Sequence, residues 1–238
     1  MVMNKPLTIG IVGGMSPEST VIYYQQMVHR HQLEFHNHSY PRIVITSVSF
    51  QQYIDWQHDE FWEQIAQELT QEFDSLVAAG ADFAVLATNT MHKVLPLIKS
   101  SIPILSILDV VGRYARTNNL KTIGLTGTRF TMSDGFYAQG LESHGLEVLI
   151  PTATQQDRIH HIIYDELIAG EVNPSSTREF ARIAQDLSER GAEAILLGCT
   201  ELVMLVEDRP LELETIDSTR LHADAAWRMA VGLNSEAK

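Results

Sequence analysis

An internal repeat is the feature that most limits how this chain of 238 residues can fold. The segment LTIGIVGGM at residues 7–15 has a counterpart in KTIGLTGTR at residues 121–129. A second pair is GADFAVLATNT at residues 80–90 and GAEAILLGCTE at residues 191–201. In both members of the second pair a predicted helix ends at the glycine, and a short apolar strand and a small polar triplet follow. The chain is therefore predicted to contain two similar halves.

The alternation of strands and helices in each half predicts an α/β fold of two pseudo-symmetric lobes, each a parallel sheet flanked by helices. We place the first lobe at residues 1–100 and 211–238, and the second at residues 101–210. Ligands bind at the carboxyl edge of such sheets, so the triplets 88–90 and 199–201 are expected to line an active site in the cleft between the lobes. The alternative is that duplicated folds repeat such a pattern without sharing a site.

Composition narrows the partners that this chain can have. Its 30 acidic and 17 basic residues give a formal net charge of −13, which argues against a nucleic-acid scaffold. No run approaches the roughly 18 apolar residues of a membrane span, and the segment Met1–Pro6 lacks the apolar region of a signal peptide. A single cysteine permits neither an intramolecular disulfide nor a thiolate metal cluster. We expect a cytoplasmic protein with no membrane or nucleic-acid partner.

A glycine turn follows the first predicted strand and opens a helix. Ser16 is suited to the N-cap of that helix and Pro17 to its first position. Free backbone N–H groups at such a turn attract a carboxylate or phosphate. The turn lacks the spacing of a dinucleotide-binding or P-loop motif. A structural glycine turn is at least as common as an anion site.

The second polar segment, TNTMH at residues 88–92, offers two hydroxyls, an amide and an imidazole at the end of a strand. These groups can hold a carboxylate and an amine without a metal. His92 is open to two interpretations. It either orients the neighbouring polar groups or is a histidine whose hydrogen bonds are satisfied locally.

Cys199 is the one cysteine of the chain. A lone cysteine is more often a small buried apolar residue than a catalytic group. This one follows the apolar run 194–197 and precedes a predicted helix, whose N-terminus would lower the thiol pKa from about 8.5. Thr200 and the following amides could hydrogen-bond a thiolate. Its place in the repeat makes a catalytic role the favoured interpretation.

The chain has ten histidines, which raises the question of a metal site. The close pairs are His29 with His31, His36 with His38, and His160 with His161. The first two pairs share a side only on an extended strand, and neighbours on a helix point in different directions. None has a compelling carboxylate or cysteine partner, so no metal is expected.

The motifs GGMS at 13–16, TNTMH at 88–92 and GCTE at 198–201, set on two similar halves, resemble the aspartate/glutamate racemases from Leu7 to about Ala230. The resemblance implies an isomerase of D-amino-acid metabolism that forms a homodimer and needs no pyridoxal phosphate, metal or other cofactor. In that family two opposed groups, usually both cysteines, remove the Cα proton from one face and return one to the other. A thiolate base, a dry cleft and fixed hydrogen bonds would lower the barrier.

Carried over by position, the resemblance makes Cys199 and Thr88 the catalytic pair. It also implies a set of residues that cradle the α-carboxylate and amine of the substrate: Met15, Ser16, Asn89, Thr90, Thr128 and Thr200. Thr128 is the second-half counterpart of the Gly14 turn, which fits that role.

Thr88 departs from the family pattern, because most relatives have a cysteine there. A threonine hydroxyl is too weak an acid to serve as an alkoxide base near pH 7, so at best it relays or donates a proton. In the family the second-lobe cysteine works on the L-enantiomer and the first-lobe cysteine on the D-enantiomer. We therefore predict that Cys199 deprotonates L-aspartate or L-glutamate, while attack on the D-form is feeble.

Ile168 is a second departure, because some relatives have there a lysine that binds the side-chain carboxylate of the substrate. Arg129, Arg158 or Gln52 would have to replace it. An arginine suits bidentate carboxylate recognition, although a surface salt bridge is a common fate for any one of them. Aspartate and glutamate both remain open as substrates.

Two alternatives stay open. Arylmalonate decarboxylases resemble this fold and use one cysteine as a proton donor, although TNTMH fits an amino-acid racemase better. Hydantoin racemase and maleate isomerase fit less well, because both normally use paired cysteines. An alternative of another class is a non-catalytic protein that captures a dicarboxylate, with Cys199 as a small core residue.

Overall fold

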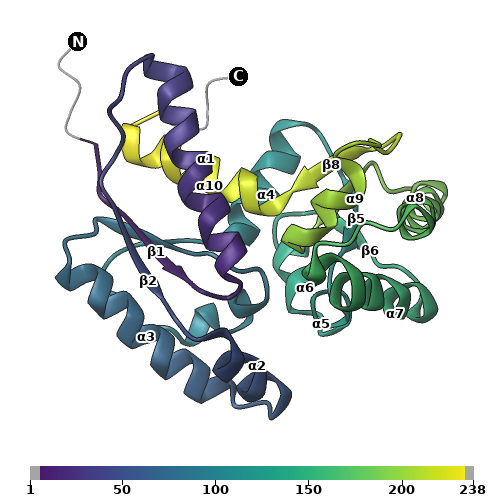
Figure 1. Ribbon diagram of the computed structural model, residues 1–238, viewed down its shortest axis with the longest axis horizontal. Helices are drawn as coiled ribbons and strands as arrows, with labels where there is room; N and C mark the ends of the chain where they lie inside the picture. Colours follow the sequence, from purple (N-terminus) through teal and green to yellow (C-terminus); the bar gives the residue numbers. More distant parts are fainter. Residues whose placement is uncertain (1–5, 234–238) are drawn as a thin grey trace. The chain divides into compact units, whose positions relative to one another are not determined.

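A computed structural model describes residues 6–233 (Figure 1). The chain forms two compact units. The first unit contains the described residues up to Ile107 and those from Thr219 onward, and the second unit is Leu108–Ser218. Each unit has a four-stranded parallel sheet, in the order β2-β1-β3-β4 in the first and β6-β5-β7-β8 in the second. The matching strand orders confirm the predicted α/β fold of two similar halves.

The elements of the first unit are the strands β1 (Ile9–Gly13), β2 (Ile43–Ser47), β3 (Phe83–Leu86) and β4 (Ile104–Leu105), the helices α1 (Pro17–Phe35), α2 (Phe50–His58), α3 (Trp62–Ala78) and α10 (Ser218–Val231), and the 3-10 helix η1 (Thr90–Leu97). Those of the second unit are the strands β5 (Thr122–Thr126), β6 (Glu147–Leu149), β7 (Ala194–Leu197) and β8 (Glu214–Asp217), the helices α4 (Ile107–Thr117), α5 (Arg129–Ser133), α6 (Phe136–Glu142), α7 (Ala153–His161), α8 (Pro174–Glu189) and α9 (Val203–Val206), and the short turns η2 (Ile162–Glu166), η3 (Leu167–Ala169) and η4 (Thr200–Leu202). Within the described part of the chain, no helix has the length and apolarity to cross a bilayer.

The chain passes from the first unit to the second and back again, and both of these boundaries differ from those predicted for the lobes. Strand β4 pairs with β3 and so extends the first unit beyond residue 100. Strand β8 pairs with β7, with Glu214 opposite Ala194, so residues 211–218 belong with the second unit. An apolar run shows that a strand is present, but it does not show which sheet supplies the neighbouring strand. The two boundaries were therefore the weakest part of the prediction.

Helices cover both faces of the first sheet, and successive residues of its strands point alternately to one face and to the other. Ile11 and Val85 pack toward α1 and α10, in a cluster that contains Trp227. Val12 and Leu86, the next residues along the same strands, pack on the opposite face in the cluster of α3. Figure 1 shows α1 and α10 on one side of β1 and α3 on the other. Two covered faces fix the register of β1 and β3, and with it the position of the residues that follow each strand.

Two glycines end the helices that precede the matching strands β3 and β7. Gly80 follows α3 with φ of +85°, and Gly191 follows α8 with φ of +107°. Residues with a side chain rarely adopt this left-handed conformation, so glycine is favoured at both positions. The structure thus confirms the helix ends predicted from the repeat.

Candidate functional site

The glycine turn after β1 is closed by its own hydrogen bonds. Ser16 is the N-cap of α1, and its Oγ accepts from the Ser19 N–H at 3.3 Å. The Gly14 N–H donates to Thr20 Oγ1 at 2.8 Å. Gly14 has φ of +93°, and a Cβ there would collide with the Val48 carbonyl. The turn therefore has a structural explanation, and the Gly14 amide is already used within it.

Thr128 takes the same local arrangement in the second unit. It is the N-cap of α5, and its Oγ1 accepts from the Thr131 N–H at 3.3 Å and lies 3.2 Å from Thr131 Oγ1. Ser16 Oγ lies 3.3 Å from Ser19 Oγ in the equivalent pair. This match confirms that Thr128 is the counterpart of the first glycine turn. Its contact with a substrate stays a prediction.

The segment after β3 leaves Thr88 half-buried and Asn89 buried, and η1 begins at Thr90. The Thr88 carbonyl lies 2.8 Å from Nδ1 of the buried His92. The other ring nitrogen of His92, Nε2, accepts from the Ile107 N–H at 3.0 Å. His92 is thus in contact with the strand end that carries Thr88. Both interpretations of this histidine remain compatible with its contacts.

Cys199 follows β7 and is the N-cap residue of the three-residue turn η4. Its Sγ–H donates to Glu201 Oε2 at 2.9 Å, and the Thr200 hydroxyl donates to the same oxygen at 2.8 Å. Burial raises the pKa of the Cys199 thiol well above its usual value, and the negative charge of Glu201 raises it further. Backbone hydrogen bonds at Thr200 and Glu201 lower it only in part. The resting side chain is therefore the neutral thiol.

This result corrects the expectation that a helix N-terminus lowers the thiol pKa. The helical segment after Cys199 is a 3-10 turn of three residues followed by the four residues of α9, so its dipole is small. The carboxylate of Glu201 lies close to the sulfur and opposes the dipole. The sequence shows Glu201 two positions after the cysteine, but it does not show that the side chain folds back onto the sulfur.

Tyr164 and His160 pack together in the second unit, and neither was predicted as a site residue. Partial burial raises the pKa of the Tyr164 hydroxyl, and electrostatic interactions with Cys199 and Glu201 raise it further. The Tyr164 and His160 rings are 4.5 Å apart between centroids. His160 Nδ1 accepts from the Arg129 N–H at 3.4 Å. The only sequence signal for Tyr164 was its position in the segment that contains Ile168.

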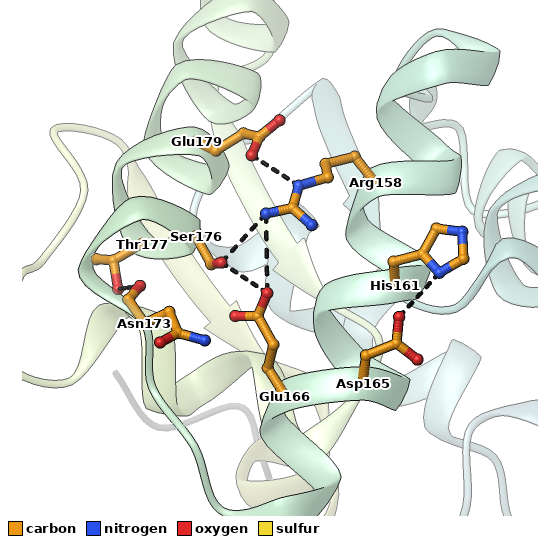
Figure 2. Close-up of polar contacts among 8 residues, drawn as sticks. All are labelled: Arg158, His161, Asp165, Glu166, Asn173, Ser176, Thr177 and Glu179. Atoms are coloured by element: carbon orange, nitrogen blue, oxygen red, sulfur yellow. Dashed lines mark hydrogen bonds and ion pairs between the residues drawn. The ribbon is translucent and has the colours of Figure 1, made fainter.

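Arg158 is held in a network of carboxylates, as Figure 2 shows. Its Nε donates to Glu179 Oε2 at 2.7 Å, and its Nη2 donates to Ser176 Oγ at 3.3 Å. Nη2 also lies 3.7 Å from Glu166 Oε1, which accepts from the Ser176 hydroxyl at 2.9 Å. The hydrogen bond that Arg158 donates to Glu179 raises the pKa of its guanidinium. A substrate carboxylate at Arg158 would have to compete with two carboxylates of the protein.

The other two candidates for the side-chain carboxylate are less constrained. Arg129 Nη2 forms an ion pair with Asp157 Oδ1 at 2.6 Å, with both side chains about half exposed, at 51% and 54%. An exposed pair of this kind contributes only about 0–1 kcal/mol. Gln52 is exposed on α2. The assignment of a substrate carboxylate to any of the three stays a prediction. Residues 6–233 contain no cluster of three or more metal-ligating side chains.

Comparisons with known proteins agree over most of the chain. A model of the family described as Asp/Glu/Hydantoin racemase matches residues 12–226. A solved structure of a candidate Asp/Glu racemase from Yersinia pestis is 35% identical, with a TM-score of 0.90 and coverage of 94% of this chain and 99% of that one. An aspartate racemase homologue from Pyrococcus horikoshii OT3 is 31% identical, with a TM-score of 0.84 and coverage of 94% and 98%.

A curated relative is the glutamate racemase of Exiguobacterium sibiricum, which is 27% identical over 149 residues. The matched segment is 61% of this chain and 54% of that protein, so the chain spans about half the length of this relative.

Proposed function

Because the chain belongs to the Asp/Glu/Hydantoin racemase family, we propose that it racemises an acidic amino acid, aspartate or glutamate, by Cα deprotonation and reprotonation. Membership of the family supports an isomerase of the racemase type. The finer assignment rests on one contact, the hydrogen bond of 2.9 Å from the Cys199 thiol to Glu201 Oε2. This contact provides both a sulfur that can exchange a proton with Cα and a carboxylate that can exchange a proton with the sulfur.

The neutral thiol defines the first step of the proposed reaction. The thiol proton passes by way of Glu201 Oε2 to solvent, leaving a thiolate on Cys199, and the positive charge of the substrate ammonium stabilises that thiolate. The thiolate then takes the α-proton of the L-enantiomer, and the electron pair of the broken C–H bond passes into the substrate carboxylate. Reprotonation on the opposite face completes the inversion.

Thr88 is the proposed partner of Cys199 on that opposite face. Its hydroxyl can donate a proton to Cα while it takes one from water, but it cannot become an alkoxide base near neutral pH. Removal of the α-proton from the D-enantiomer is therefore slower than removal from the L-enantiomer. The equilibrium constant between two enantiomers is one, so this bias lies in rates and binding.

Hydrogen–deuterium exchange at Cα tests the proposed function. The protein is incubated in deuterated buffer with each enantiomer of aspartate and glutamate, and loss of the Cα–H signal is followed by proton NMR. We expect exchange of an L-form, reduced about 10²- to 10⁴-fold by Cys199→Ala, which is the usual contribution of a positioned acid or base. Binding without exchange of any of the four amino acids would instead support a dicarboxylate-binding protein.

A single-cysteine decarboxylase is the second candidate, and the protonated thiol favours it. An enzyme of this type needs a proton donor, and the raised pKa of Cys199 keeps its proton on the sulfur at neutral pH. Release of carbon dioxide from an arylmalonate, lost in Cys199→Ala, would select this candidate. A homodimer and independence of a cofactor remain predictions from the family, the first of which sedimentation of the purified chain can test.

A further inference from the structure

The Thr88 carbonyl lies where the hydrogen bonds of the first sheet end. The Ala87 N–H still donates to the Val12 carbonyl at 2.8 Å, whereas the Thr88 N–H turns back to the Leu86 carbonyl at 2.9 Å. The Thr88 carbonyl is held by His92 Nδ1 at 2.8 Å. A side chain, rather than a neighbouring strand, therefore restrains the first residue that follows this sheet edge.

The hydrogen bonds of His92 fix its tautomer. A backbone N–H can only donate, so Nε2, which accepts from Ile107, carries no proton. A carbonyl can only accept, so Nδ1 carries the proton and donates it to Thr88. His92 is thus a neutral imidazole with both nitrogens engaged, and the residue is 3% exposed. Protonation of Nε2 would place two donors against each other.

A second buried histidine, His222, holds residues 105–107, the segment to which His92 is hydrogen-bonded. Its Nε2 lies 2.9 Å from the Leu105 carbonyl, so this nitrogen carries the proton, and its Nδ1 accepts from the Tyr23 hydroxyl at 2.6 Å. The two imidazole rings meet edge to face, with centroids 5.8 Å apart. His222 thus holds the carbonyl of Leu105, while His92 holds the amide of Ile107 two residues later. The segment that contains Ile107, the donor to His92, is therefore itself held in place by His222.

We propose that His92 is a positioning residue for Thr88: its Nδ1–H fixes the Thr88 peptide, and with it the hydroxyl that serves the D-face of the substrate. This inference rests on the proposed function for its catalytic consequence, but not for its geometry. A histidine that only filled the core would affect the two faces of the substrate equally. A positioning residue on the Thr88 side affects the D-enantiomer selectively, because the Cys199 side is carried by the other unit.

Two substitutions separate the contacts of His92. The amide nitrogen of His92→Asn lies near the place of Nδ1 and can still donate to Thr88, but it leaves Ile107 without its acceptor. The carbonyl of His92→Gln reaches the place of Nε2 and can accept from Ile107, but it leaves the Thr88 carbonyl without its donor. Tyr23→Phe is the matched control, because it removes a buried hydroxyl from the same cluster without touching His92.

The first measurement is the ratio of Cα–H exchange rates for the D- and L-enantiomers in deuterated buffer. We expect His92→Gln to lower the D/L ratio about ten-fold, the effect of one lost hydrogen bond, while His92→Asn and Tyr23→Phe keep it within about two-fold of the wild type. Equal losses for both enantiomers in His92→Gln would overturn the inference and leave the proposed function intact. A wild-type protein without exchange would refute the proposed function instead.

The second measurement tests whether His92 holds Thr88, even if the wild-type protein shows no exchange. Nitrogen-15 NMR of the labelled protein should show the Nδ1–H tautomer for His92 and the Nε2–H tautomer for His222. The Asn89 amide, whose peptide contains the Thr88 carbonyl, should shift in His92→Gln and not in Tyr23→Phe. An Nε2–H tautomer at His92, or an unmoved Asn89 amide in His92→Gln, would show that this imidazole does not hold Thr88.

Discussion

The Cys199 thiol lies 2.9 Å from Oε2 of Glu201, a carboxylate only two residues further along the chain. The carboxylate accepts a second hydrogen bond, from the Thr200 hydroxyl at 2.8 Å, which fixes it in this position. A negative charge held this close opposes formation of a thiolate. Glu201 therefore controls when the sulfur can act as a base, and this role can be measured without any substrate.

Glu201→Gln should lower the pKa of the Cys199 thiol, because it removes the charge that disfavours the thiolate and leaves the backbone hydrogen bonds that favour it. Cys199 is the only thiol of the chain, so the rate of alkylation by iodoacetamide against pH reports this one group. The curve of the variant should lie at lower pH than that of the wild type. Glu207→Gln removes an equal charge from the same segment and should leave the curve in place. A curve that does not move, or moves to higher pH, would mean that Glu201 does not control the thiol.

The pH dependence of the reaction should separate the two candidate functions. The pKa of Cys199 is raised well above its usual value, so in the neutral range the thiolate fraction grows about ten-fold for each pH unit. For the racemase, kcat/KM with the L-enantiomer should rise between about pH 6 and 8.5, because this parameter reports groups of the free enzyme. A decarboxylase that uses the thiol as proton donor would show no such rise. Glu201→Gln should move the rising limb to lower pH.

Thr88→Cys should speed exchange of the D-enantiomer, because a thiol ionises far more readily than a hydroxyl and can take the α-proton itself. A gain of about 10²-fold is the lower end of what a positioned base contributes. Exchange of the L-enantiomer should change much less, since Cys199 is untouched. Thr88→Ser keeps a hydroxyl and serves as the control. An unchanged ratio of L- to D-exchange in Thr88→Cys would mean that Thr88 does not serve the substrate.

Local motifs allowed the fold to be predicted from the sequence. The repeat identified Thr128 as the counterpart of the Gly14 turn, and the structure shows that Thr128 caps its helix as Ser16 does, because an N-cap depends only on residues three positions apart. Gly80 and Gly191 were found for the same reason, since a left-handed residue after a helix is a local requirement. Strand β8 was assigned to the wrong unit because pairing with β7 is a long-range choice.

The candidate site was harder to predict than the fold, because its properties depend on contacts that a sequence motif does not contain. His92 meets Ile107, which lies 15 residues away. The pKa of Cys199 depends on the rotamer of Glu201, which the order of the residues leaves open. Tyr164 was missed because its electrostatic interaction with Cys199 arises only when η3, which follows η2 in the chain, packs against η4. A motif thus identified which residues carry the chemistry, but not their protonation.

Arg158 and Arg129 should respond differently to removal of their charge. Arg158→Gln removes the ion pair of Glu179 and that of Glu166, whose side chain is 16% exposed and keeps only its hydrogen bond from Ser176, a loss of about 1–3 kcal/mol. For a chain of this size the melting temperature should fall by roughly 2–10 °C, with little change in KM. Arg129→Gln breaks only an exposed pair with Asp157, so its melting temperature should stay within about 2 °C of the wild type. If Arg129 binds the side-chain carboxylate of the substrate, the KM of Arg129→Gln should rise instead. Scanning calorimetry of both variants measures the melting temperatures, and steady-state kinetics measure the KM values. A raised KM without destabilisation in Arg158→Gln would identify Arg158, and not Arg129, as the ligand of the substrate.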